Sequence, residues 1–230
     1  MKTIIKLSEV YKIYNANLPN EVKALNGISL EIKEGEFTAV VGPSGSGKTT
    51  LLNCIGGLDK PDKGSVIVDD IEIVELKENE LINFRLQHIG FVFQSYNLIP
   101  VLTAKENVGF VMLLQNKKKV EIEQRVMELL DSVGLKGLED KRPNQMSGGQ
   151  QQRVAVARAL ASKPRFILAD EPTANLDSKS TNDLLDIMEK LNKNEGITFL
   201  FSTHDQRVID RAHRVIEVVD GTVAADKTIK

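Results

Sequence analysis

The sequence predicts an α/β fold: a core with a mostly parallel central sheet, an N-terminal antiparallel β subdomain and an inserted α-helical subdomain. Alternating polar and apolar residues fill the first third of the chain, as in antiparallel strands that bury one face. From Leu98 to about Leu160 the apolar residues follow a helical period, and apolar strands return afterwards. The order strand, helix, strand in this last part favours parallel pairing through a right-handed crossover.

The individual elements follow from the same patterns. Three segments alternate with period two, namely "IIKLSEVYKIY", "GISLEIKEGEFTAVVG" and "GSVIVDDIEIVEL", and the run "FTAVV" within them suits a strand buried on both faces. In the helical part, one face of "VEIEQRVMELLDSVG" is predicted to carry Val120, Val126, Leu129, Leu130 and Val133. Gly134 is predicted to end this helix.

Beyond the helical part, "RFILAD" and "ITFLFSTH" are predicted strands, separated by the helix "SKSTNDLLDIMEKLNKNEG". Asp220-Gly221 lies between two β-rich runs and predicts a short hairpin. We find no repeat and no low-complexity linker, so we expect a single domain over 1–230. Within it, 1–94 and 161–230 form the α/β core with the antiparallel β subdomain, and 95–160 form the helical subdomain.

Composition limits the possible partners and compartment. Among 230 residues, 30 Lys and Arg face 32 Asp and Glu, and the net charge of −2 disfavours nucleic acid as a partner. The single cysteine, Cys54, excludes an internal disulfide and is expected to be a small buried apolar residue. The first residues lack the pattern of a signal peptide, and no apolar run approaches the roughly 20 residues of a membrane span. We therefore expect a soluble cytoplasmic chain, for which any membrane role must come through a partner.

A glycine-rich loop follows the apolar strand "FTAVV" and fits the pattern G-x-x-x-x-G-K-[ST], which predicts a P-loop NTPase core. Its glycines allow backbone N–H groups to point at phosphates. Lys48 can reach the β and γ phosphates, and the Thr49 hydroxyl can bind Mg²⁺. The nucleotide-binding residues predicted here are Gly42, Pro43, Ser44, Gly45, Ser46, Gly47, Lys48, Thr49 and Thr50.

Two further strands deliver polar residues at their carboxyl ends, where an open parallel sheet places its ligands. "RFILADEP" presents Asp170, which suits Mg²⁺, and Glu171, which can polarise the water that attacks the γ phosphate. "FLFSTHD" presents His204, whose imidazole can reach the same phosphate. His88 and His213 lack such a setting and are expected to be structural or exposed.

A second glycine-rich turn begins a helix in "QMSGGQQQRVAVARAL". Ser147, Gly148 and Gly149 combine a hydroxyl, close backbone approach and a helix N-terminus, all of which suit a terminal phosphate. A capped helix alone requires only the serine. The turn therefore predicts a second phosphate-binding surface in a chain that already has one.

Taken together, these motifs resemble those of the nucleotide-binding subunit of ATP-binding-cassette (ABC) transporters, over nearly the whole chain. The resemblance identifies Gly42–Thr50 as Walker A, "RFILADE" as Walker B and "SGGQQ", including Gln150, as the signature. It also identifies Gln94 as the Q-loop residue, Asp177 as the end of the D-loop and His204 as the switch histidine. It implies ATP and Mg²⁺ as cofactors, and an aromatic residue stacked on adenine, for which Tyr14 aligns better than Tyr11.

The resemblance also implies roles and partners. It assigns catalysis to Glu171, His204, Lys48 and Gln94, and metal binding to Thr49, Gln94 and Asp170. Two copies of the chain would form a homodimer that encloses two ATP molecules, each between the Walker A of one copy and the signature of the other. The sequence around the motifs is most similar to that of the lipoprotein-release and macrolide-efflux groups. This similarity implies peripheral attachment to the inner face of the cell membrane through a membrane partner.

The surface that receives the membrane partner is expected near Gln94–Leu102, where Gln94 precedes the helical part. Six residues there are candidates for docking a transmembrane helix, or alternatively belong to the core of the helical subdomain: Tyr96, Leu98, Ile99, Pro100, Val101 and Leu102. The run Lys117–Lys119 is expected to be a solvated face.

Three functions compete at this stage. The leading one is an ATPase that powers transport or transmits force across a membrane. An ATPase acting on nucleic acid would need a long coiled-coil insertion, tandem cassettes or a basic groove, none of which the sequence contains. A cell-division-like regulatory ATPase, which signals through a membrane partner without transport, needs the same motifs. The sequence therefore does not separate this regulator from an ATPase that powers transport.

Overall fold

A computed structural model describes residues 2–229 of the chain. The strands are β1 Thr3–Tyr14, β2 Val22–Lys33, β3 Phe37–Val41, β4 Lys63–Val68, β5 Ile71–Glu72, β6 Ile89–Val92, β7 Phe166–Asp170, β8 Thr198–Ser202, β9 Arg214–Val219 and β10 Thr222–Thr228. The helices are α1 Lys48–Ile55, α2 Glu78–His88, α3 Ala104–Leu114, α4 Lys119–Ser132, α5 Gly148–Ala161, α6 Ser178–Glu195 and α7 Gln206–Arg211, with short 3₁₀ turns at Ile73–Glu75 and Pro143–Gln145.

An antiparallel sheet is formed by four strands of the first third, in the order β2-β1-β4-β5, whereas β3 belongs to the second sheet. β1 pairs antiparallel with both β2 and β4. The strands alternate as predicted: on β1, Ile5 and Leu7 are buried while Lys6 is exposed. The predicted antiparallel β subdomain is confirmed.

A second sheet of six strands has the order β10-β9-β3-β8-β7-β6. All of its pairs are parallel except β9 with β10. The turn between β9 and β10 contains Asp220 at φ 47° and Gly221 at φ 72°. Two successive positive φ values define the type I′ turn that the Asp-Gly pair predicts. The mostly parallel central sheet is therefore confirmed.

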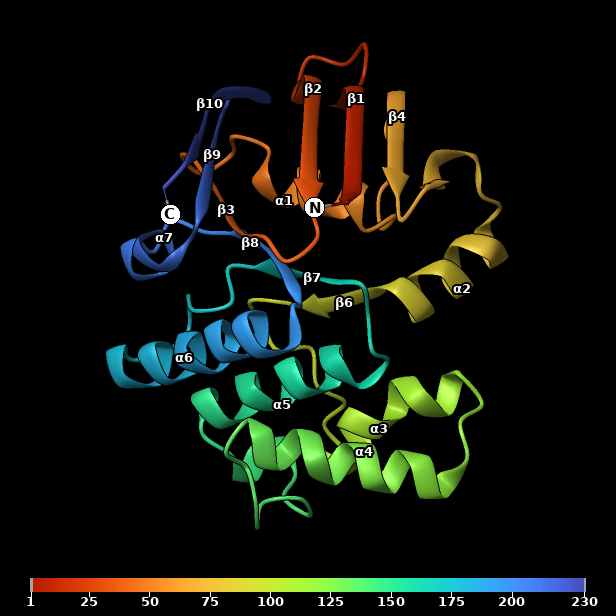
Figure 1. Cartoon of the computed structure of the whole chain (residues 1–230). Coiled ribbons are helices and arrows are strands. Elements are labelled where there is room, and N and C mark those ends of the chain that lie inside the picture. Colours follow the sequence, from red (N-terminus) through yellow and green to blue (C-terminus); the bar gives the residue numbers. More distant parts are fainter. Residues whose placement is uncertain (1, 230) are drawn as a thin grey trace.

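The central sheet is covered on both faces, which explains its continuous apolar strands. On β8, Phe199 and Phe201 belong to a core shared with the helices, whereas Leu200 belongs to a core shared with the antiparallel sheet. The two cores lie on opposite sides of the sheet: β1, β2 and β4 are on one side, and α3, α4 and α5 on the other (Figure 1). Side chains that alternate along one strand thus hold the two layers together.

The helical layer contains α3, α4 and α5, as the helical period indicates. On α4, Val126, Leu129 and Leu130 are buried as predicted, and Gly134 follows the helix at φ 71°. The prediction for Val120 is wrong because this side chain is 74% exposed. Val120 lies in the first turn, six positions before Val126. At about 100° per residue, this separation falls about 120° short of two full turns, so Val120 points away from the buried face. The subdomain limits at 95 and 160 stay a prediction.

Several minor predictions are also resolved. Cys54 is buried, and burial raises the pKa of its thiol to about 12. The His88 ring stacks on Phe84, and its Nδ1 lies 3.0 Å from Asp69 Oδ2, a structural role. Among residues 2–229, no helix is long and apolar enough to cross a membrane.

Candidate functional site

The glycine-rich loop connects the end of β3 to the start of α1, in the order strand, loop, helix that its pattern requires. Its shape depends on close neighbours as well as on phosphate chemistry. A Cβ added to Gly42 would lie 2.1 Å from Val218 O, and one added to Gly47 would lie 2.2 Å from Ala24 O. Both glycines also have positive φ values, 149° and 103°. The loop is therefore fixed between the C-terminal hairpin and β2.

Lys48 begins α1 and is only 8% exposed. Its Nζ donates to the carbonyl oxygens of Gly42 and Pro43, each at 2.9 Å. These bonds hold the ammonium against the inside of the loop. A compact ammonium group with three donors is suited to phosphate oxygens at this position.

The next residue of α1, Thr49, faces the carboxyl end of β7. Its hydroxyl donates to Asp170, with Oγ1 at 3.0 Å from Oδ1 and 3.2 Å from Oδ2. Ser202 at the end of β8 donates its hydroxyl to the same Asp170 Oδ1. Mg²⁺ in nucleotide sites takes one or two protein oxygens and completes its shell with water and phosphate. The donor set of Thr49 and Asp170 fits that ion.

Glu171 and His204 form a pair beside this donor set. His204 Nδ1 lies 2.8 Å from Glu171 Oε1, and Glu171 has a left-handed backbone at φ 47°. The Glu171 side chain is 15% exposed and that of His204 is 72% exposed. The second carboxylate oxygen of Glu171, Oε2, is buried without a hydrogen-bond partner in the described chain. Glu171 also lines the cavity beside the glycine-rich loop, where a carboxylate is suited to orient a water molecule.

A cavity of about 720 Å³ is lined by Lys48, Thr49, Glu171 and His204 together. Asp170 does not line it but accepts a hydrogen bond from Thr49, which does. Tyr14 also lines this cavity, and its hydroxyl donates to Asp59. Burial raises the pKa of the Tyr14 hydroxyl, which keeps the ring neutral. Tyr11, in contrast, bonds to Glu9 at 3.3 Å and does not line the cavity. The lining consists of Tyr14, Val22, Ala24, Gly42, Pro43, Ser44, Gly45, Gly47, Lys48, Thr49, Thr50, Gln94, Glu171 and His204.

The second glycine-rich turn lies outside this cavity, because none of the residues from Ser147 to Gln150 lines it. Ser147 caps α5: its Oγ accepts from Gln150 N at 3.3 Å, and Gln150 Oε1 accepts from Ser147 N at 2.9 Å. A Cβ added to Gly148 would lie 2.8 Å from the Tyr96 hydroxyl oxygen. Asp177 likewise caps α6 by accepting from Ser180 N at 2.9 Å. Ser147 and Asp177 are exposed.

Four residues that contact the predicted site residues or the backbone beside them were not predicted from the sequence. They are Ser202, Gln152, Arg158 and Asn175. Ser202 could have been found, because "FLFS" runs parallel to "FILAD" and the register pairs Ser202 with Asp170. The other three contact backbone carbonyls near Gln94 or Glu171, and no sequence pattern reports on such contacts. Gln152, for example, donates to Pro172 O at 2.7 Å from a fully buried position.

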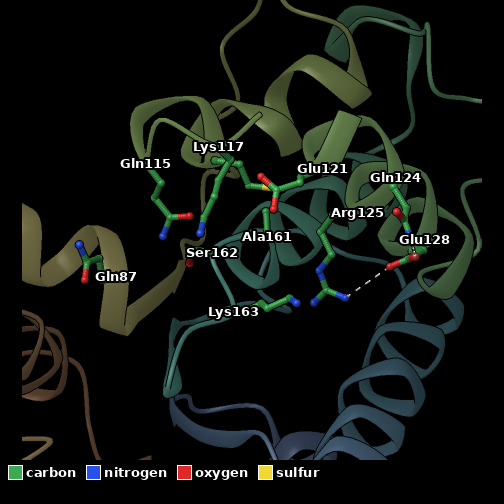
Figure 2. A pocket seen from close by; sticks show the side chains of 11 residues that line it. Gln87, Gln115, Lys117, Glu121, Gln124, Arg125, Glu128, Ala161, Ser162 and Lys163 are labelled. Carbon is green, nitrogen blue, oxygen red and sulfur yellow. Dashed lines mark hydrogen bonds and ion pairs between the residues drawn. The ribbon is translucent and has the colours of Figure 1, made fainter. Parts of the chain in front are cut away.

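Figure 2 shows a different cavity, of about 540 Å³, between α4 and the end of α5. It contains both signs of charge: Arg125 lies 4.0 Å from Glu128, and Glu121 and Lys163 also line it. None of the predicted nucleotide-binding or catalytic residues lines this cavity. The predicted nucleotide-binding and catalytic residues gather instead at the cavity beside the glycine-rich loop.

The fold and site together define a P-loop NTPase with an inserted helical layer. The ABC transporter family model matches residues 25–174, and the chain belongs to the ABC transporter family as one of its ATPase subunits.

Several relatives and a solved structure support this assignment. The chain is 46% identical to the lipoprotein-releasing system ATP-binding protein LolD 1 of Rhodopseudomonas palustris, over 97% of this chain and 100% of that one. It is 44% identical to the macrolide export ATP-binding/permease protein MacB of Rhodopirellula baltica, over 96% of this chain and 32% of that longer one. A dimeric post-hydrolysis structure of the ATP-binding cassette MJ0796, bound to ADP and Pi, superimposes with a TM-score of 0.91 at 44% identity, covering 99% of each chain. The MJ0796 protein comes from Methanocaldococcus jannaschii.

Proposed function

We propose that two copies of this chain enclose two ATP molecules and that hydrolysis of the ATP reopens the dimer. The observation that carries this proposal is the division of phosphate-binding groups between two surfaces. The glycine-rich loop lines the cavity beside Lys48, whereas the exposed Ser147 and the two glycines that follow it lie outside that cavity. A two-fold axis would bring the Ser147 turn of one copy to the γ phosphate in the cavity of the other. The dimeric MJ0796 structure supports this arrangement.

Within each site, we assign the steps to the residues that line the cavity and to Asp170, which bonds to Thr49 beside it. Lys48 and the loop amides hold the phosphates, and Tyr14 stacks on the adenine. Thr49, Asp170 and Gln94 are the groups available to Mg²⁺, which neutralises phosphate charge when bound. Glu171 orients and deprotonates the attacking water, and His204, bonded to Glu171 at 2.8 Å, contacts the γ phosphate. Asp177 lies on the surface that faces the partner copy.

The Glu171→Gln variant tests both catalysis and dimerisation. Glutamine keeps the size of the side chain and an acceptor for His204, but it cannot remove a proton. We expect hydrolysis to fall by about 10²- to 10⁴-fold, the usual contribution of a general base. Bound ATP should then persist and the dimer should accumulate in size-exclusion chromatography with ATP. A Glu171→Gln protein that stays monomeric in saturating ATP would refute the shared site.

We further propose that the dimer drives a membrane permease or force-transmitting subunit of the lipoprotein-release or macrolide-export type, from the inner face of the cell membrane. The LolD and MacB relatives support this assignment. The docking surface is an apolar groove of about 520 Å³ between α2 and α3. Three large side chains at this groove are exposed in the isolated chain: Leu58 (46%), Ile82 (45%) and Leu114 (52%). Exposed apolar area of this kind suits an incoming helix.

This groove adjoins the segment predicted from the sequence, but none of the six docking candidates named there lines it. Phe93 and Asn97 line the groove, whereas Ile99 and Val101 do not. Leu98 packs against the helical core, and Val101 is 72% exposed outside the groove. The groove therefore rests mainly on α2, β6 and α3.

Recovery of the membrane subunit tests the docking surface. We expect the double variant Ile82→Asp, Leu114→Asp to lose copurification of that subunit from membranes while keeping its own ATP-dependent dimerisation. Val120→Asp is the matched control, because Val120 is an equally apolar residue, 74% exposed, that does not line the groove. Equal recovery with the double variant and the control would refute this docking site. Identifying the recovered subunit would also show whether it has the cavity of a permease.

A further inference from the structure

A loop of residues 93–97, here named the Gln94 loop, carries Gln94 into the nucleotide cavity with an unfavourable backbone. Tyr96 and Asn97 have φ values of 57° and 49° in succession. Two consecutive non-glycine residues in the left-handed region persist only where surrounding groups hold them. The loop therefore needs external contacts to keep its shape.

Arg158 of α5 supplies the contacts at the bend. Its guanidinium donates from Nη2 to Tyr96 O at 2.8 Å and from Nη1 to Asn97 O. These are the carbonyls of the two residues with left-handed backbones. A planar guanidinium can bind two neighbouring carbonyls at once, which an ammonium cannot do with the same geometry.

Within the described chain, Arg158 forms no ion pair that would offset the burial of its charge. Burial lowers the pKa of its guanidinium, and among residues 2–229 the structure gives it no carboxylate partner. A partly buried cation without a counterion costs free energy that only its hydrogen bonds offset. Arg158 also lines the apolar docking groove. One side chain thus contacts both that groove and the Gln94 loop.

Asn175 holds the other side of the loop. Its side-chain Nδ2 donates to Gln94 O at 3.0 Å, and its backbone carbonyl oxygen accepts from the Tyr96 hydroxyl at 3.4 Å. Asn175 lies between Glu171 and Asp177, in the segment proposed to face the partner copy. The Gln94 loop is therefore held from the signature helix on one side and from the segment after β7 on the other.

From these contacts we infer that Arg158 and Asn175 are positioning residues that clamp the Gln94 loop and so set where the Gln94 side chain lies in the nucleotide cavity. Displacement of Arg158 by a helix in the docking groove would release Tyr96 O and Asn97 O and shift Gln94. The clamp thereby gives the partner a direct physical route to the rate of hydrolysis. This inference rests on the proposed role of Gln94 at the γ phosphate and its metal.

The test uses two variants of the full chain, Arg158→Lys and Asn175→Asp. Lysine keeps the charge but can hold only one of the two carbonyls well, and aspartate replaces the donor with an acceptor of the same size. We expect amide hydrogen exchange at residues 94–97 to accelerate at least about tenfold, because the loop opens locally. The kcat for ATP should fall about 10- to 100-fold through misplacement of Gln94, with KM changed less than about twofold. Asn175 is exposed, so Asn175→Asp carries the test if Arg158→Lys does not fold.

Arg125→Lys is the matched control. Arg125 also donates a hydrogen bond from its guanidinium to a carbonyl of the helical layer, Leu160 O at 3.4 Å. Its side chain lies beside Glu128 in the other cavity (Figure 2) and has no recorded bond to the Gln94 loop. It should leave both readouts unchanged. The inference is overturned if exchange at 94–97 does not change, or if it rises equally throughout α3, α4 and α5. Faster exchange at 94–97 with an unchanged kcat would support the clamp and overturn the proposed role of Gln94, so the two failures are distinguishable.

Discussion

Replacing Ser147 by arginine separates the two roles of this residue, the cap of α5 and the contact with the partner's nucleotide. The Ser147 hydroxyl accepts one backbone hydrogen bond, from Gln150 N at 3.3 Å, whereas the reciprocal bond to Gln150 Oε1 uses the Ser147 amide and survives the change. Losing a serine cap costs about 1 kcal/mol. For a chain of this size, that free energy lowers Tm by about 2–4 °C. The fold and the nucleotide cavity of the same chain should therefore persist.

Dimer closure should respond very differently, because a long side chain at this exposed turn fills the space that the partner's phosphate needs. In a Glu171→Gln background, we expect Ser147→Arg to bind fluorescent ATP normally and to stay monomeric in size-exclusion chromatography. Thr103→Arg is the control, since Thr103 caps α3 with the same reciprocal pair of bonds, to Glu106, at 3.3 and 2.7 Å. It should lower Tm equally and still dimerise. A Ser147→Arg protein that dimerises as well as the Thr103→Arg protein would refute the split site.

Three further results are expected. Ser202→Ala removes the hydroxyl that donates to Asp170. It should raise the Mg²⁺ concentration for half-maximal ATPase activity by about 10-fold or more, because groups that hold a metal ligand typically contribute that much. An unchanged Mg²⁺ titration would contradict the metal assignment. Tyr14→Ala should weaken ATP binding by about 1–3 kcal/mol in titration calorimetry, whereas Tyr11→Ala should not. Hydrogen bonds from Arg214 lower the pKa of Asp226, so this contact stabilises the fold above the ordinary carboxyl pKa of about 4 and is lost as pH falls further. Thermal unfolding between pH 7 and pH 3 should accordingly show a shallower acid loss for Asp226→Asn.

The sequence predicts most reliably those features that depend on residue type and local order. The Asp220-Gly221 turn follows from backbone preferences that few other residues share, and the strands follow from their alternation. The prediction for Val120 failed for a reason that the sequence does contain. At about 100° per residue, six positions place Val120 about 120° around the helix from Val126, off the buried face.

The candidate site divides in the same way. Asp170, Glu171 and His204 lie at or just after the carboxyl ends of β7 and β8, so their closeness could be expected from the rule for parallel sheets. Lys48 follows from the glycine-rich motif itself. Contacts to backbone carbonyls, such as that of Arg158 with Tyr96, leave no trace in residue spacing. They depend on how a loop bends, and that bend is set by packing between segments far apart in the chain.

The close approach of Val218 O and Ala24 O to the glycine-rich loop has a consequence for biosynthesis. The loop is complete in sequence once Thr49 has been added, but the strand that fixes Gly42 comes from the C-terminal hairpin. Gly221 N also donates to Ser46 O at 3.0 Å. A ribosome-bound chain therefore carries the whole phosphate-binding motif well before it contains the hairpin at Asp220-Gly221 that contacts the loop.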